Sequence, residues 1–83
     1  MIAEDGMKQY KGIFKKIFPN IAEEDYAGMR VGDPMEWDSL HHMQLVSALE
    51  KEFSIQLGMD GIVKFRSFQQ GIELLREKLA WLS

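Results

Sequence analysis

The 83-residue chain contains no cysteine, only two prolines and no long run of apolar residues. The absence of cysteine excludes disulfides and thiolate zinc sites, so the fold must be stabilised by packing. A membrane-spanning helix needs about 20 consecutive apolar residues. The first residues also carry Glu4 and Asp5, where a secretory signal would carry basic residues. We therefore expect a cytoplasmic protein without a transmembrane segment.

The composition is that of a folded domain, with 46% hydrophobic and 11% aromatic residues, which argues against intrinsic disorder. A chain of this length forms one domain, here residues 1–83. It buries about 60–65% of the surface that its unfolded form exposes, which leaves little room for a deep catalytic cleft.

The net charge of −3 is unevenly distributed. Residues 1–22 carry four lysines against two acids and sum to +2, residues 23–60 sum to −7, and residues 61–83 sum to +2. An acidic middle third repels nucleic acid and attracts a basic partner. The simpler interpretation is a solvated loop that happens to be acidic. In either case, no nucleic-acid partner is expected.

Apolar spacing predicts a first helix over residues 3–18, and Pro19-Asn20 ends it. Its apolar stripe is Met7, Tyr10, Phe14 and Ile17. A long connection, residues 19–38, follows and contains Gly28, Gly32 and Pro34. A connection of this length in a small domain is often functional.

A second helix is predicted over residues 39–53, with Asp38 or Ser39 as its N-cap. Residues 54–57 read as an extended linker, and a short third helix or turn follows Gly58. Ser67 and Gln70 fit a capping box at the start of the last helix. The buried stripe predicted for the last helix is Phe68, Ile72, Leu75 and Leu79. Gly71 should cost this helix about 1 kcal/mol relative to alanine. The expected fold class is all-α, a small four-helix bundle with three longer helices and a short third helix.

Ser39 stands where the connection enters the second helix. Taken alone, a serine at this place is most often a capping residue. Its surroundings are Glu36-Trp37-Asp38-Ser39-Leu40, followed by Leu45, Val46, Leu49, Glu50, Phe53, Ile55 and Leu57. Together they resemble the prosthetic-group segment of acyl carrier proteins. In that family an Asp-Ser-Leu begins the second helix of a four-helix bundle, and the serine is esterified to 4′-phosphopantetheine.

The resemblance implies a non-catalytic carrier whose cofactor is covalent 4′-phosphopantetheine on Ser39, flanked by Asp38 and Leu40. A phosphopantetheinyl transferase would add the arm from coenzyme A, and a monomeric carrier would present thioesters to acyl ligases, synthases or transferases. Lipid, fatty acid or polyketide biosynthesis would use such a carrier. The partner-docking residues implied are Glu36, Leu40, His41, Met43, Gln44 and Ser47. The residues implied to line an acyl-chain cavity between the second and third helices are Val46, Leu49, Ile62, Phe65 and Phe68.

The chain departs from the family pattern on the surface of the second helix, which reads His41, His42 and Gln44. Fatty-acid-synthesis carriers usually place an acid soon after the Ser-Leu and another at the position of Gln44. A less acidic surface favours a dedicated pathway over general fatty-acid synthesis. Histidine charges near neutral pH, so docking could also depend on pH. The simpler interpretation is that both are exposed surface residues with no special role.

Several alternatives stay open on the sequence. An aminoacyl or peptidyl carrier is one, although such carriers more often show Gly-Gly ahead of the serine. A helical interaction adaptor without a prosthetic group is another. A hydrolase with Ser39 as nucleophile and His42 as base lacks a G-x-S-x-G elbow. A metal site from Asp38 and His42 needs a third ligand such as Asp33 or Glu36, so no metal is expected.

Overall fold

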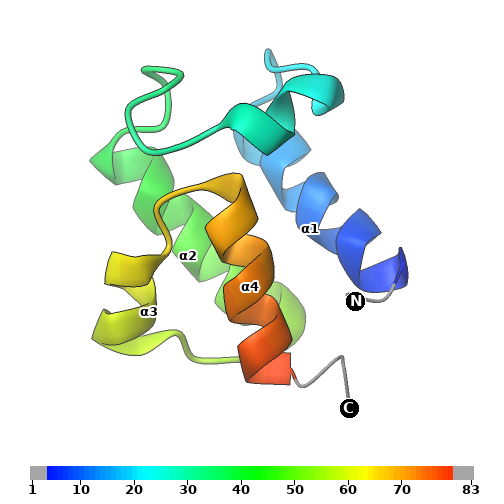
Figure 1. Cartoon of the computed structure of the whole chain (residues 1–83), viewed down its shortest axis with the longest axis vertical. Helices are drawn as coiled ribbons and strands as arrows, with labels where there is room; N and C mark the ends of the chain where they lie inside the picture. The colour runs from blue at the N-terminus through cyan, green and yellow to red at the C-terminus, as the bar shows by residue number, and fades with distance from the viewer. Residues whose placement is uncertain (1–3, 80–83) are drawn as a thin grey trace.

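The structure is a computed structural model that describes residues 4–79. The elements are α1 (Glu4–Ile17), the 3₁₀ helix η1 (Glu23–Gly28), α2 (Ser39–Phe53), α3 (Gly58–Lys64) and α4 (Phe68–Leu79). Within this range there is no strand, and only isolated bridges join Arg30 to Asp33 and to Ser67. The all-α prediction is confirmed. In Figure 1, α1 runs antiparallel to α2, and α4 runs in the same direction as α2.

The predicted stripe of α1 forms one wall of the core. Tyr10 and Phe14 are fully buried, and Met7 and Ile17 are partly buried against them. Ile13, which the stripe did not include, is also buried. The four lysines of this helix lie on its outer side or at its margin.

The core is centred on the Phe14 ring, whose centroid lies 4.9 Å from that of Phe68 in α4 and 5.5 Å from that of Trp37. Tyr10 donates a 2.7 Å hydrogen bond from its hydroxyl to the Phe68 carbonyl, and burial raises the pKa of this phenol. The contacts of Phe14 with Phe68 and with Trp37 are edge-to-face, and each such pair adds about 0.5–1.5 kcal/mol beyond its buried area. The core therefore joins α1, α4 and the segment just before α2.

The connection over residues 19–38 contains the helix η1, which the sequence analysis did not predict. Tyr26 and Met29 are buried under it. The connection is tied to the start of α4 by two backbone bonds, Val31 N to Arg66 O (2.9 Å) and Phe68 N to Met29 O (3.0 Å). Gly32 has φ +89°, a left-handed conformation that suits glycine, and its N–H bonds to the Trp37 carbonyl at 2.9 Å. The segment that leads to Ser39 is thus fixed on the core.

The ends of α2 follow the capping signals. Asp38 is the N-cap, and the predicted bounds of the helix are confirmed. At its other end Ser54 takes the left-handed conformation (φ 54°, ψ 46°), and the amides of Ser54 and Ile55 both bond to the Glu50 carbonyl. This is the pattern of a Schellman-type C-cap, where glycine is usual.

We expect Ser54→Gly to raise the free energy of unfolding by about 0.5–1 kcal/mol, because it relieves the steric cost of a left-handed side-chain-bearing residue. Urea denaturation followed by circular dichroism measures the change. Ser47→Gly is the matched control. Ser47 is exposed inside the same helix, so glycine there should lower stability by about 0.5 kcal/mol. A loss of stability in both variants would contradict the left-handed assignment.

The second half of the chain matches the predicted order of elements. Residues 55–57 are neither helix nor strand, and Leu57, predicted to be part of an extended linker, instead has helical dihedral angles (φ −78°, ψ −34°). Its amide donates to the Glu50 carboxylate at 2.9 Å. Ser67 caps α4 by accepting from the Gln70 amide at 3.1 Å. Gln70 completes the cap one residue earlier than predicted, since its side-chain oxygen accepts from the Arg66 amide at 3.1 Å. Phe68, Ile72 and Leu75 are buried as predicted, and the Leu79 side chain lies outside the described residues.

Candidate functional site

Ser39 is the first residue of α2 and is exposed. The start of α2 lies at the same end of the molecule as the connection and the start of α4 (Figure 1). Within residues 4–79, no side chain or backbone group is hydrogen-bonded to the Ser39 hydroxyl. The hydroxyl is therefore free and accessible at a helix start.

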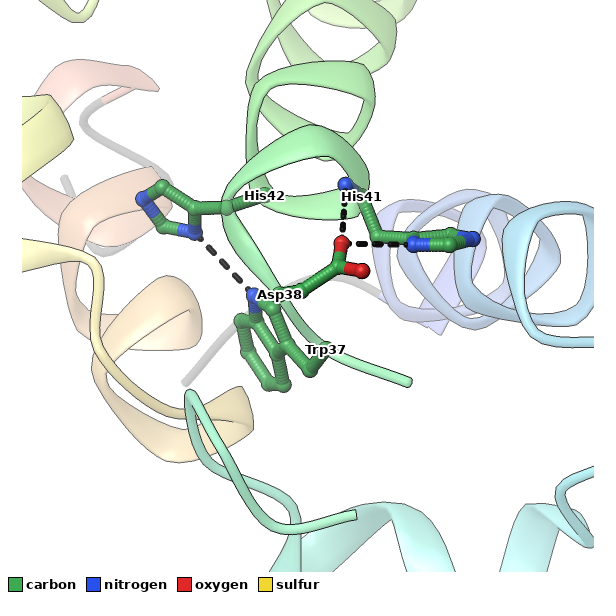
Figure 2. Close-up of polar contacts among 4 residues, drawn as sticks. All are labelled: Trp37, Asp38, His41 and His42. Atoms are coloured by element: carbon green, nitrogen blue, oxygen red, sulfur yellow. Dashed lines mark hydrogen bonds and ion pairs between the residues drawn. The ribbon is translucent and has the colours of Figure 1, made fainter. Parts of the chain in front are cut away.

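Asp38 holds the first turn of α2 through a single carboxylate oxygen. Its Oδ1 accepts from the His41 backbone amide at 2.9 Å and from the His41 ring Nδ1 at 2.8 Å (Figure 2). Because a carboxylate can only accept, Nδ1 of His41 carries the proton. The bond from the His41 amide, followed by the bond from its ring and the ring's charge, holds the pKa of the Asp38 carboxyl below the ordinary value of 3.8.

The lowered pKa of Asp38 sets the direction of a pH effect on folding. A carboxyl with a depressed folded pKa stabilises the fold above its unfolded value, and this contribution is lost as the pH falls through the folded value. We expect the wild type to lose thermal stability between about pH 5 and pH 2 by more than Asp38→Asn does. Asparagine is also a good N-cap, so the variant retains the cap without the charge. Melting curves across this range measure the difference, and equal losses would contradict the pKa assignment.

The first turn of α2 keeps unpaired backbone donors beside the Ser39 hydroxyl. The amides of Ser39 and Leu40 have no acceptor within residues 4–79, whereas the next two amides bond to the side chain and the carbonyl of Asp38. Unpaired amides and the positive end of the helix dipole favour negative charge at a helix start. The start of α2 therefore offers two unpaired donors next to an exposed hydroxyl.

His42 lies in the core, which corrects the expectation that both histidines lie on the helix surface. It is 7% exposed, and its ring stacks near the rings of Trp37 and Phe65. Its Nδ1 accepts from the Trp37 indole N–H at 3.1 Å, and its Nε2 lies 3.2 Å from the Ile62 carbonyl oxygen. The two imidazoles point to opposite sides of the helix start (Figure 2). The sequence indicated the burial of His42, since it lies three residues before Leu45 and seven before Leu49 on the buried stripe.

The hydrolase and metal-site alternatives depend on where the imidazoles of His42 and His41 lie. Both ring nitrogens of His42 are used inside the core, so this residue cannot serve as a base for Ser39. The ring of His41 is bound to Asp38 and lies over the Phe18 ring at 5.5 Å. Among residues 4–79, no group of three or more histidine, aspartate or glutamate side chains is arranged to hold a metal ion.

The docking residues implied by the resemblance lie at the surface around Ser39. Leu40 is 66% exposed and Met43 is 48% exposed, although apolar residues at helical spacing are usually buried. Three further docking residues are also exposed, namely Glu36, Gln44 and Ser47. His41 is partly buried. Three large apolar side chains that the sequence analysis did not assign to docking are also exposed: Met35, Met59 and Val63. Met59 and Val63 are four apart on α3 and so share one face of that helix.

The residues implied for an acyl-chain cavity are core residues. Val46, Leu49 and Phe65 are buried, and Ile62 is partly buried beside them. Phe68 instead packs with the rings of Tyr10, Phe14 and Tyr26 on the side of α1 and η1. A chain that entered between α2 and α3 would therefore have to displace packed side chains.

No helix within residues 4–79 combines the length and apolar character needed to cross a bilayer. Comparison of the chain with protein-family models, with curated proteins and with solved structures found no match. The site must therefore be interpreted from its own geometry and from the sequence motif around Ser39.

Proposed function

We propose that the protein is an acyl carrier protein that bears 4′-phosphopantetheine on Ser39. The observation that carries the proposal is the exposed, unbonded Ser39 hydroxyl at the first position of α2, within an Asp-Ser-Leu motif. The helix lengths support a carrier-type four-helix bundle, since α3 has 7 residues against 14, 15 and 12 in α1, α2 and α4.

The residues around Ser39 fit the arm. The free amides of Ser39 and Leu40 would face the phosphodiester, while Asp38 uses its carboxylate within the helix cap and keeps the first turn in place. When attached, the arm supplies a thiol that holds an acyl group as a thioester. The chain itself then tethers the cargo and raises its effective concentration at each partner enzyme.

The surface around Ser39 suits partner enzymes that present apolar side chains and a few basic groups. Its exposed apolar side chains on α2 are Leu40, which follows Ser39 directly, and Met43, which lies one turn further on. The neighbouring helix α3 exposes Met59 and Val63 as well. Methionine adapts to differently shaped partners. The connection contributes exposed acids next to it, Asp33 and Glu36.

The second-helix surface itself carries little negative charge, which supports a dedicated pathway with its own ligase or synthase. His41 and Gln44 stand where fatty-acid-synthesis carriers usually have acids, and His41 also occupies the Asp38 carboxylate. Cytoplasmic biosynthesis of a lipid or polyketide-like product is the setting we propose.

The proposal is tested by incubating the purified protein with coenzyme A and a broad-specificity phosphopantetheinyl transferase. Intact-mass spectrometry should show one added phosphopantetheine on the wild type and none on Ser39→Ala. Ser47→Ala, which changes an exposed serine of the same helix, should be modified like the wild type. An unmodified wild type would favour the interaction adaptor, and modification of Ser39→Ala would place the arm elsewhere.

A further inference from the structure

His42 is a fully satisfied polar side chain inside an apolar core. The indole of Trp37 can only donate, so Nδ1 of His42 must be the acceptor of their 3.1 Å bond. The Ile62 carbonyl can only accept, so Nε2 must carry the proton across the 3.2 Å contact. The two partners together select the neutral Nε2–H tautomer. The aromatic rings packed against the imidazole are those of Trp37 and Phe65.

The Ile62 carbonyl needs a partner because α3 ends two residues later. The amide four residues on, that of Arg66, bonds to the Gln70 side chain instead. Carbonyls of a last helical turn are satisfied from outside the helix or remain unpaired. His42 supplies this bond from α2 and so serves as a cap for α3. A helix of 7 residues with no side-chain bond at its N-cap depends strongly on such contacts.

We propose that His42 is a positioning residue that latches α3 to the Ser39 end of α2. Trp37 lies two residues before Ser39 and is 0% exposed, while His42 lies three residues after it. The chain on both sides of Ser39 is therefore joined through one imidazole to the end of α3. Removing either hydrogen bond of His42 lets α3 move relative to α2, while the aromatic core around Phe14 stays packed.

The latch sets the spacing between the exposed apolar side chains of α2 and those of α3. Leu40 and Met43 lie on α2, and Met59 and Val63 lie on α3. It also closes the space between α2 and α3, where Val46 and Phe65 are packed. A role of the latch in admitting cargo or a partner rests on the proposed carrier function. The existence of the latch does not depend on that function.

The test uses ¹⁵N NMR and amide hydrogen exchange on protein that carries no phosphopantetheine, so that it is independent of any modification of Ser39. In the wild type, His42 should show a protonated Nε2 and a bare Nδ1. In His42→Leu, the amides of residues 62–65 should exchange at least about fivefold faster, while those buried in α1 change less. His41→Leu is the matched control, and α3 exchange should be unchanged there.

Trp37→Phe tests the other bond of the latch and serves if His42→Leu does not fold. It retains an aromatic ring but removes the donor, so His42 should populate both tautomers and α3 should exchange faster. The proposal is overturned if His42 carries its proton on Nδ1 in the wild type. It is also overturned if these variants speed exchange equally in α1 and α3, or leave α3 unchanged. A failed transferase assay with an intact latch would reject only the carrier function.

Discussion

Replacing Trp37 by alanine is expected to lower the free energy of unfolding by about 3–5 kcal/mol. The side chain is fully buried, and its ring contacts those of Phe14, Phe18 and Phe65. The substitution also leaves Nδ1 of His42 without its donor. A domain of this size has about 4–12 kcal/mol of stability in total, so much of it would be lost.

Urea denaturation followed by far-ultraviolet circular dichroism measures this loss without relying on the indole that is removed. Trp37→Phe is the control for the volume of the ring, and it should cost clearly less than alanine. Leu40→Ala, which truncates a side chain that is 66% exposed, should change stability by about 0.5 kcal/mol or less. A Trp37→Ala variant as stable as Leu40→Ala would contradict the position of Trp37 in the core.

Gly71→Ala is expected to destabilise the protein by about 1–3 kcal/mol, although alanine is the better helix former. A Cβ at Gly71 would overlap the Tyr10 hydroxyl and would lie 2.6 Å from Cε1 of Phe65. The Tyr10 hydroxyl is bonded to the Phe68 carbonyl, so moving it away breaks a buried hydrogen bond. Gly71 is therefore a contact point between α4 and α1.

Gly12→Ala provides the control of opposite sign. Gly12 lies within α1, is exposed, and has no atom within 4 Å of the position that its Cβ would take. Only helix propensity acts there, so alanine should stabilise by about 1 kcal/mol. Both variants are compared by their urea midpoints. Stabilisation by Gly71→Ala would show that α1 and α4 do not approach as closely as described.

The sequence predicted those features that depend on neighbouring residues. The bounds of α2, an N-cap at Asp38 or Ser39 and the Ser67 cap follow from interactions within one helical turn, which a local motif contains in full. The structure selected Asp38 of the two candidates. The exposure of Ser39 follows in the same way from its place at a helix start. The motif around Ser39 was likewise visible in the sequence, and the function attached to it remains a proposal to be tested.

Features that depend on distant residues were missed or misjudged. The helix η1 follows Pro19 and has no apolar period, so its formation depends on burying Tyr26 against the Phe14 and Phe68 rings. His42 was assigned to the helix surface by comparison with the carrier-family pattern, although the period of its helix indicated the core. Met59 and Val63 could not be separated from the buried side of α3 by hydrophobicity alone.

The sequence by itself determined an all-α chain, the order and ends of its main helices, and a serine presented at the start of α2. These are consequences of period, capping and turn chemistry, which act over a few residues. The tertiary structure decided which histidine is buried and why Gly71 has no side chain. It also decided how α3 is held to α2. Each of these depends on which groups approach from elsewhere in the chain, and that is set by packing in three dimensions.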